Sequence, residues 1–409
     1  MQVFGTHEEK TLDQLAAVAQ RAEWVALMAD GHLGYVMPIG GVAAYDNQVS
    51  VVGVGFDIAC GNAAIRTDLT LTDLGGTMEA LGSVLTELAD TIWGTVSFGI
   101  GRRNQADDAP VDHPLFDDPA WDAVPAKHRQ ALRDKARNQL GTVGSGNHYV
   151  DVFADESETI WVGVHFGSRG FGHTVASGFL ALGQGADWGK HVPERELLLD
   201  LDTPMGHDYW QLMTLAGAYA YAGREWVARK VVGMLGGAEL ELVHNHHNFA
   251  WQEHHHDADY VVVRKGATPA FPAQLGFVGG SMGDDAVIVR GADVTVDSDP
   301  EAYRLQHAAL FSTVHGAGRV MSRTAAAGKR NRRTGKVLSP GRVTADMMQD
   351  WIKSKGVVLR GGGLDESPHV YRRLPDVLAA QGNTVEVLHT LRPLVVVMAG
   401  ANEFDPYKD

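Results

Sequence analysis

The chain has one cysteine, Cys60, among its 409 residues. A single thiol cannot form an intrachain disulfide, so disulfide-stabilised scaffolds are excluded, and a lone cysteine is typical of a reducing compartment. The sequence also lacks an apolar run of the roughly 18 residues that a membrane helix needs. Residues 1–10 lack the basic and then apolar pattern of a signal peptide. We therefore expect a cytoplasmic protein with no membrane partner.

Positive charge is scarce, with 35 Lys and Arg against 50 Asp and Glu and a formal net charge of -15. This balance excludes bulk attraction to nucleic acid, so any polyanion must be bound by a local basic patch or by a metal. The Walker A motif is also missing, which excludes an ordinary P-loop. Apolar residues make up 44%, as in globular proteins, and the 19 histidines exceed ordinary usage. The histidine excess directs attention to site chemistry.

Hydrophobic periodicity predicts both helices and strands along the whole chain. Helices are expected over 11–28, 76–92, 123–139, 207–235, 300–311 and 343–354. Strands are expected over 47–58, 148–153, 159–166, 261–264, 286–290, 294–296, 357–360, 385–388 and 393–399. Because these elements are mixed without strict βαβ alternation, we expect an α+β fold with mixed sheets in one large domain.

Thiol, carboxylate and imidazole groups recur at the ends of the predicted strands. Asp57 and Cys60 lie three residues apart in a glycine-bounded turn, where both can face one ion, and His148 and His165 stand where Gly/Ser loops meet strands. His247 follows an apolar stretch and is the favoured ligand of a histidine-rich tract, in which His244 and His246 remain alternatives. The competing interpretation is a buried cysteine that acts as a small hydrophobe.

A second candidate centre is the glycine-rich turn that begins at His315 and ends at Arg319. An imidazole can act as a nucleophile, and an arginine can neutralise phosphate oxygens. The segment 167–170, Gly-Ser-Arg-Gly, adds backbone N–H donors and the Arg169 guanidinium, which also suit phosphate. The competing interpretation is an ordinary glycine turn that carries an incidental histidine.

Several short motifs follow one another in a fixed order. They are Asp-Ile-x-Cys-Gly from residue 57, Gly-Ser-Gly-Asn-His from 144, His-x-Gly-Ser-Arg-Gly from 165, His-His-Asn from 246, Arg-Lys-Gly-Ala from 264, Gly-Ser-Met-Gly from 280 and His-Gly-Ala-Gly-Arg-x-Met-Ser-Arg from 315. The ordered set closely resembles the RtcB family of GTP-dependent RNA ligases, from about residue 30 to residue 408. The resemblance implies one catalytic domain over 1–409, with mixed and antiparallel sheets in a central sandwich flanked by helices.

The resemblance also implies a reaction and its cofactors. Members of that family join an RNA 3′-phosphate or 2′,3′-cyclic phosphate end to a 5′-hydroxyl end, in RNA repair or tRNA splicing, with GTP and two Mn²⁺ ions and in some cases an archease-type activator. It implies that Cys60 bridges the two ions, that Asp57 and His148 complete one site, and that His165 and His247 complete the other. It implies that His315 forms a histidine–GMP intermediate and that an RNA-ppG end follows.

Further roles are carried over from the resemblance to individual residues. Those implied to surround the guanine nucleotide are Asn147, Asp151, Ser281, His315, Gly316, Gly318, Arg319, Tyr371 and Lys408. Arg169 and Lys265 are candidates for phosphate or RNA contact. The basic residues of the segment 329–336 either follow the RNA backbone or form a solvated loop.

Two other functions use the same residues. A dinuclear metallophosphoesterase acting on RNA or nucleotide phosphates would use the metal cluster with water as the nucleophile, and it would need neither His315 nor GTP. A non-catalytic RNA-binding subunit would keep a structural metal, which is normally coordinatively closed. Incubation with labelled GTP discriminates the ligase from the phosphoesterase, because only the ligase labels its own histidine.

Overall fold

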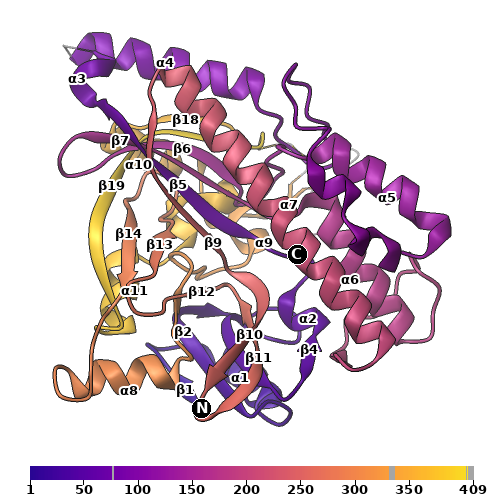
Figure 1. Ribbon diagram of the computed structural model, residues 1–409. Coiled ribbons are helices and arrows are strands. Elements are labelled where there is room, and N and C mark those ends of the chain that lie inside the picture. The colour runs from indigo at the N-terminus through magenta and orange to yellow at the C-terminus, as the bar shows by residue number, and fades with distance from the viewer. Residues whose placement is uncertain (76–77, 331–336, 402, 404–409) are drawn as a thin grey trace.

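The computed structural model describes residues 1–75, 78–330, 337–401 and 403, and its largest sheet has eight strands (Figure 1). Seven strands pair antiparallel in the order β13 (Leu275–Val278), β14 (Ala286–Gly291), β19 (Val385–Met398), β6 (Tyr149–Ala154), β7 (Thr159–Phe166), β5 (Gly61–Thr70) and β9 (Glu239–His246). The eighth, β18 (Val358–Arg360), pairs in parallel with β19.

This sheet curls until its two edge strands, β13 and β9, face each other. The side chain of Asn245 in β9 bridges them, because its Nδ2 donates to the Leu275 carbonyl at 3.0 Å and its Oδ1 accepts from the Phe277 N–H at 3.3 Å. Inward-facing side chains from all seven strands fill the interior: Ala64, Phe153, Trp161, Val243, Phe277, Ala286, Ile288 and Leu391. The result is a near-barrel with a packed apolar centre.

Two long helices cover the outer face of the near-barrel. They are α4 (Met78–Thr95) and α7 (Pro204–Leu235), and the latter runs diagonally across Figure 1. The Thr203 side chain begins α7 by accepting from the Gly206 N–H, and Gly236 ends it with a φ of 75°. The apolar sides of both helices pack on outward-facing residues of the sheet, such as Ile65 and Val164. Burial of this face fixes α7 against the strands that carry the site.

A second sheet of five strands lies beside the near-barrel. Its order is β1 (Gln2–Val3), β2 (Trp24–His32), β3 (Ile39–Tyr45), β11 (Ala258–Lys265) and β10 (Asn248–His255). A short ladder of β12 (Ala267–Pro269) with β15 (Ser312–Val314) adjoins it. The chain passes from β9 to β10 through His247 alone and leaves β15 directly into His315. Both histidines therefore lie at the junction of the two sheets.

The remaining elements surround these sheets. The helices are α1 (Glu9–Val18), α2 (Val51–Val54), α3 (Leu71–Leu74), α5 (Ala126–Gln139), α6 (Arg169–Gly183), α8 (Pro300–Ala308), α9 (Arg323–Ala327), α10 (Ala345–Lys355) and α11 (Leu374–Gln381). The further strands are β4 (Gln48–Ser50), β8 (Leu198–Asp200), β16 (Gly328–Arg330) and β17 (Val337–Pro340). Among the described residues, no helix is long and apolar enough to cross a membrane.

The predicted α+β class with mixed sheets flanked by helices is confirmed. The single helix predicted over 11–28 is wrong, because α1 ends at Val18 and the apolar run from Trp24 is a buried strand, β2. A short apolar run fits either element. The strand predicted over 47–58 is interrupted by α2, where the Ser50 hydroxyl caps the Gly53 N–H. No strand forms over 294–296.

Candidate active site

One pocket of about 300 Å³ opens where the near-barrel meets the second sheet. Its walls include most of the residues that the sequence singled out, among them Asp57, Cys60, Asn147, His148, Asp151, His165, His247, Ser281, His315, Gly316, Gly318, Arg319 and Tyr371. These side chains come from both sheets and from the turns between them. The chain thus brings residues more than 300 positions apart into one cavity.

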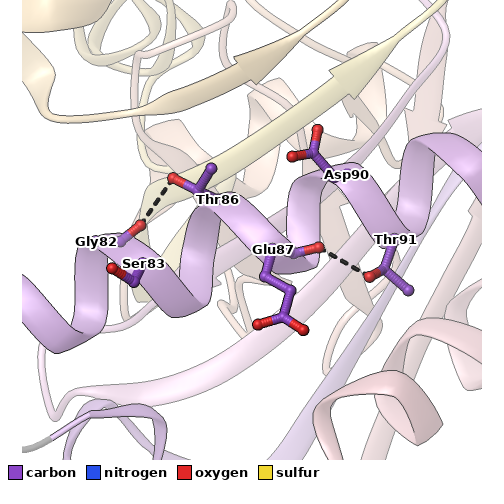
Figure 2. Close-up of a pocket in the computed structure, with 6 residues that line it drawn as sticks. All are labelled: Gly82, Ser83, Thr86, Glu87, Asp90 and Thr91. Atoms are coloured by element: carbon purple, nitrogen blue, oxygen red, sulfur yellow. Dashed lines mark hydrogen bonds between the residues drawn. The ribbon is translucent and has the colours of Figure 1, made fainter.

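A more open hollow of about 820 Å³ lies along the exposed side of α4 (Figure 2), and it shares no lining residue with this pocket. Its polar side chains are partly used by the helix itself. The Thr86 hydroxyl donates to the Gly82 carbonyl and the Thr91 hydroxyl donates to the Glu87 carbonyl, both at 2.8 Å. The residues that line it include neither histidine nor cysteine, so we place the chemistry in the smaller pocket.

The turn after α2 presents the first group of candidate metal ligands. The Cys60 N–H donates to the Asp57 carbonyl at 3.0 Å, which closes the turn and points both side chains toward His148. Nε2 of His148 lies 3.1 Å from Oδ2 of Asp57 and 3.5 Å from Sγ of Cys60. A Cβ added at Gly167 would lie 2.3 Å from Oδ1 of Asp57, so the glycine leaves room for this carboxylate.

A second group shares the same sulfur. Nε2 of His165 lies 3.3 Å from Sγ of Cys60, and the ring of His247 lies 5.2 Å from that of His165. The ligand atoms of Cys60, His165 and His247 lie within 4.8 Å of one another, as do those of Asp57, Cys60 and His148. Cys60 belongs to both groups, and a thiolate in that position can contact two ions.

Backbone carbonyls orient two of the imidazoles. Nδ1 of His148 lies 2.9 Å from the Val143 carbonyl, and Nδ1 of His165 lies 3.0 Å from the Asn147 carbonyl. With a proton on each Nδ1, Nε2 would offer its lone pair to an ion beside Cys60, and a carbonyl behind Nδ1 is the usual outer support of a metal-binding histidine. This sulfur, nitrogen and oxygen donor set fits borderline-soft divalent transition metals, but it does not by itself choose one.

Burial governs the protonation of these groups. It lowers the pKa of both His165 and His247 well below the usual value, and the neighbouring histidines add to the effect. Burial raises the pKa of the Cys60 thiol well above its usual value, with the Asp57 charge acting in the same direction. Burial alone would raise the pKa of Asp57, but its hydrogen bond and charge interaction with His148 outweigh this and lower it to about 2. In the metal-free protein, the imidazoles of His165 and His247 are therefore neutral and the Cys60 thiol is protonated.

His315 stands on the opposite wall of the pocket, held by Asp30 of β2. Nδ1 of His315 lies 2.6 Å from Oδ2 of Asp30, and the same oxygen accepts from the backbone N–H groups of His315 at 3.0 Å and Gly316 at 3.2 Å. Asp30 is fully buried. The ring centroid of His315 lies 4.9 Å from that of His247. The candidate nucleophile is thus directly beside the candidate metal ligands.

The comparisons with known proteins agree with this geometry. The family described as tRNA-splicing ligase RtcB matches residues 11–399. The chain belongs to the RtcB family. The RNA-splicing ligase RtcB of Escherichia coli strain K12 is 32% identical over 396 residues, which cover 91% of this chain and 89% of that protein. The tRNA-splicing ligases RtcB of Thermococcus kodakarensis and Archaeoglobus fulgidus are 29% and 30% identical, and each alignment covers 95% of this chain and 91% of the relative.

Arg319 is fixed at the pocket wall by buried acidic residues. Its guanidinium donates to Glu366 at 3.1 Å, to the Tyr371 hydroxyl at 3.1 Å and to the Asp365 carbonyl at 2.8 Å. The Tyr371 hydroxyl donates in turn to Glu366. Arg323 contacts Glu366 at 2.7 Å. Two cations therefore share one carboxylate beside the cavity, which is an arrangement suited to holding an additional anion.

The RtcB resemblance implies that further residues surround the guanine nucleotide, and several of these also line the pocket. Asp151 is buried, its Oδ1 has no hydrogen-bond partner among the described residues, and burial raises the pKa of its carboxyl group. Ser281 donates to Asp284. Gly318 has a φ of 73°, and a Cβ there would lie 2.3 Å from the Asp30 carbonyl oxygen. Lys408 and the segment 331–336 lie outside the described residues.

Arg169 and Lys265 do not line the pocket in this arrangement. Nη1 of Arg169 lies 3.2 Å from Nδ1 of His148, so this guanidinium stands behind a candidate metal ligand. Nζ of Lys265 is buried and donates to the carbonyls of Tyr35 at 2.7 Å and Val52 at 3.0 Å. Burial lowers the pKa of Lys265 to about 8. Their direct contact with phosphate or RNA stays a prediction.

The structure distinguishes His247 from the other two histidines of its tract. His244 and His246 point away from Cys60 and accept hydrogen bonds from Arg224, at 2.8 Å and 2.9 Å. Burial, reinforced by the Arg224 charge, lowers the pKa of His244 to about 3 and that of His246 well below its usual value. Among the three, His247 is the one grouped with Cys60 and His165.

Sequence reasoning missed four residues that shape this site: Asp30, Asn62, Arg224 and Glu366. Asp30 had a signal, since it lies in a glycine-rich run close to Cys60, and Glu366 lies in the segment that carries Tyr371. Asn62 donates to the carbonyls of Phe277 at 2.8 Å and His315 at 3.5 Å, and nothing in its local sequence indicates this. These roles depend on contacts that only the folded chain creates.

Proposed function

We propose that this RtcB-family member is an RNA ligase that joins an RNA 3′-phosphate or 2′,3′-cyclic phosphate end to a 5′-hydroxyl end, using GTP and two Mn²⁺ ions. One observation carries the proposal. A half-buried histidine with a carboxylate on its Nδ1 side, His315, stands 4.9 Å (ring to ring) from His247 of a thiol-centred ligand cluster. A phosphoesterase that uses water as its nucleophile has no need of such an imidazole.

Asp30 prepares the imidazole for attack. The carboxylate favours a proton on Nδ1 of His315, which leaves the Nε2 lone pair free. In the first step, a bond forms between Nε2 and the α-phosphorus of GTP, the bond from that phosphorus to the bridging oxygen breaks, and pyrophosphate leaves. A histidine–GMP results. The Arg319 guanidinium lines the same pocket and would neutralise phosphate oxygens.

Two further transfers complete ligation. The RNA 3′-phosphate attacks the phosphorus of histidine–GMP, the N–P bond breaks, and an RNA-ppG end forms. The 5′-hydroxyl then attacks the RNA phosphorus, and GMP leaves with the electron pair of the P–O bond. Two divalent ions held by Asp57, Cys60, His148, His165 and His247 would neutralise the crowded phosphates and assist in-line attack. A 2′,3′-cyclic phosphate must first be hydrolysed to the 3′-phosphate.

Wider roles follow from the family. The relatives are named as RNA-splicing and tRNA-splicing ligases, and we extend RNA repair or tRNA splicing to this chain on that basis. An archease-type activator is a further proposed partner. The guanine nucleotide is assigned to the part of the pocket lined by Asn147, Asp151, Ser281, Gly316, Gly318, Arg319 and Tyr371, with Lys408 as an additional contact.

A ligation assay tests the proposal against its hydrolytic alternative. An RNA with a 3′-phosphate and a second RNA with a 5′-hydroxyl are incubated with the protein and Mn²⁺, either with GTP or without it. We expect a joined product only with GTP, and none with His315→Ala, whereas the exposed control His254→Ala joins normally. Loss of the terminal phosphate without GTP, unaffected by His315→Ala, would instead identify a metallophosphoesterase.

A further inference from the structure

Arg224 is a fully buried cation behind the candidate metal cluster, on α7. Its guanidinium donates four hydrogen bonds: Nη1 to the carbonyls of Ala59 at 2.9 Å and Phe166 at 2.6 Å, Nε to His244, and Nη2 to His246. Burying a charge is costly unless it is fully hydrogen-bonded. Because Arg224 does not line the pocket, its burial must be explained by the groups that it contacts.

The two carbonyls belong to the residues next to the shared cysteine and one of its histidines. Ala59 precedes Cys60, and Phe166 follows His165. One nitrogen of the guanidinium therefore ties the turn that carries the sulfur to the strand end that carries the imidazole. Sγ of Cys60 and Nε2 of His165 lie 3.3 Å apart on the other side of this link.

Ala59 adds a second, independent observation. Its φ is 61°, in the left-handed region that residues with a Cβ rarely adopt, and its side chain is fully buried. The Ala59 N–H donates to the Asn248 carbonyl at 2.7 Å, and its own carbonyl accepts from Arg224. The peptide groups on both sides of the strained residue are thus held from outside the turn, and the strained backbone aims the following residue, Cys60.

The two extra histidines hold the guanidinium in place. A ring nitrogen that faces an arginine N–H at 2.8–2.9 Å must be the unprotonated one, so His244 accepts through Nε2 and His246 through Nδ1. Nδ1 of His244 is directed at Glu225, 3.5 Å away. The ring of His246 stacks on Tyr221 with centroids 3.9 Å apart. Neutral acceptors orient the cation without drawing it away from the two carbonyls.

We propose that Arg224 is a positioning residue that locks the left-handed turn at Ala59 against the end of β7, and so holds Cys60 and His165 at metal-binding separation. The inference rests on the proposed function in one respect, namely that metal ions bind to this cluster. It assigns to His244 and His246 the role of orienting Arg224 rather than that of ligands.

Cobalt binding to the whole, chelator-stripped protein tests the inference without any assay of ligation. Co²⁺ reports its own coordination, because a thiolate ligand gives a sulfur-to-cobalt charge-transfer absorption band. We expect Arg224→Lys to weaken Co²⁺ binding about 10- to 100-fold, as other outer supports of metal ligands do. We also expect a weaker charge-transfer band at saturation. The matched control is Arg304→Lys, because Arg304 forms an exposed ion pair with Glu301.

A double variant discriminates positioning from general structural damage. Ala59→Gly removes the Cβ that makes the left-handed turn unfavourable, so in the Arg224→Lys background it should restore Co²⁺ affinity on the order of tenfold. In the unaltered background it should change affinity much less. A loss of affinity caused by damage elsewhere would not be rescued at residue 59. A second variant, His244→Gln, disturbs only one acceptor and should weaken Co²⁺ binding several-fold, whereas exposed His254→Gln should not.

The outcomes separate the two proposals. If the unaltered protein gives no thiolate–cobalt band, the metal centre of the proposed function fails and this inference fails with it. If the unaltered protein binds Co²⁺ and folded Arg224→Lys binds it equally well, only the inference is overturned. If Arg224→Lys does not fold, unchanged affinity in His244→Gln overturns it.

Discussion

The carboxylate of Asp30 reaches the ring of His315 across 285 positions of sequence, with Oδ2 of Asp30 2.6 Å from Nδ1 of His315. The oxygen also accepts from the backbone of His315 and Gly316, so it fixes the turn that carries the ring. A carboxylate this close to Nδ1 favours a proton on that nitrogen and therefore one tautomer of the imidazole. The relationship gives the proposed nucleophile its geometry, and it leads to the first prediction.

Asp30→Asn should slow formation of protein-bound GMP by on the order of 10²- to 10⁴-fold, since an amide can present its N–H₂ to His315 and favour the wrong tautomer. The rate is measured with labelled GTP in a single-turnover experiment, beside the exposed control Asp13→Asn in α1. An unchanged rate in a folded Asp30→Asn protein would remove Asp30 from the mechanism.

Metal binding should release about one proton per chain from Cys60. Burial raises the pKa of this thiol, so it is protonated in the metal-free protein at neutral pH, whereas a metal-bound thiolate is deprotonated. His165 and His247 contribute no proton, because they are already neutral. Calorimetric titration with Mn²⁺ in two buffers of different ionisation enthalpy counts the protons, and Cys60→Ala should release none. Equal release from both proteins would contradict this assignment.

The metal-free protein should lose stability as the pH falls below about 6.5. His165, His246 and His247 have pKa values far below that of a free histidine, so the unfolded chain binds protons that the native state does not. Each such group adds at most about 1.4 kcal/mol of destabilisation per pH unit below the unfolded pKa. Thermal unfolding midpoints measured from pH 8 to pH 5 give the slope of stability against pH.

The slope should become shallower in His247→Gln and stay unchanged in His254→Gln, whose histidine is 67% exposed in its side chain. Both variants replace a histidine with glutamine, one at a buried position and one at an exposed position. If the two variants gave the same pH dependence, the neutral buried state of His247 would be wrong.

Glu366→Gln should both destabilise the protein and weaken GTP binding. Glu366 is buried and is the shared carboxylate of Arg319 and Arg323. Removing one partner of a buried ion pair costs about 3 kcal/mol at the lower end of the observed range, and the partial exposure of both arginines favours that end. Denaturant unfolding measures the stability, and the GTP concentration dependence of guanylylation measures the binding. A variant with unchanged KM for GTP would show that Arg319 does not contact the nucleotide.

The long periodic elements could be predicted from sequence, and so could short strands such as those expected over 286–290 and 357–360, whereas some apolar runs were assigned to the wrong element. The helices expected over 76–92, 123–139 and 207–235 and the strands expected over 148–153 and 159–166 are present, because each has a sustained hydrophobic period. The continuous apolar run from Trp24 fits a helix or a buried strand, and pairing with β3 decides for the strand. One catalytic domain over 1–409 stays a prediction.

The candidate site was predictable as a set of residues but not as an arrangement. Thiol and imidazole groups near the ends of predicted strands indicated Cys60, His148, His165 and His247 as metal ligands. The structure places the three histidines around the sulfur of Cys60. The supporting contacts of Asp30 and Arg224 could not be predicted, because each joins segments whose register is set only by the folded sheets. The left-handed backbone at Ala59 could not be predicted either, because alanine rarely adopts that conformation.

The most direct test of the central claim is covalent labelling of the protein with GTP labelled at the α-phosphorus, in the presence of Mn²⁺ and without RNA. The account predicts label that stays with the denatured protein, is released by acid but not by alkali, maps to His315, and is absent from His315→Gln. The absence of protein-bound label in a folded, metal-loaded protein that still processes RNA ends would contradict it.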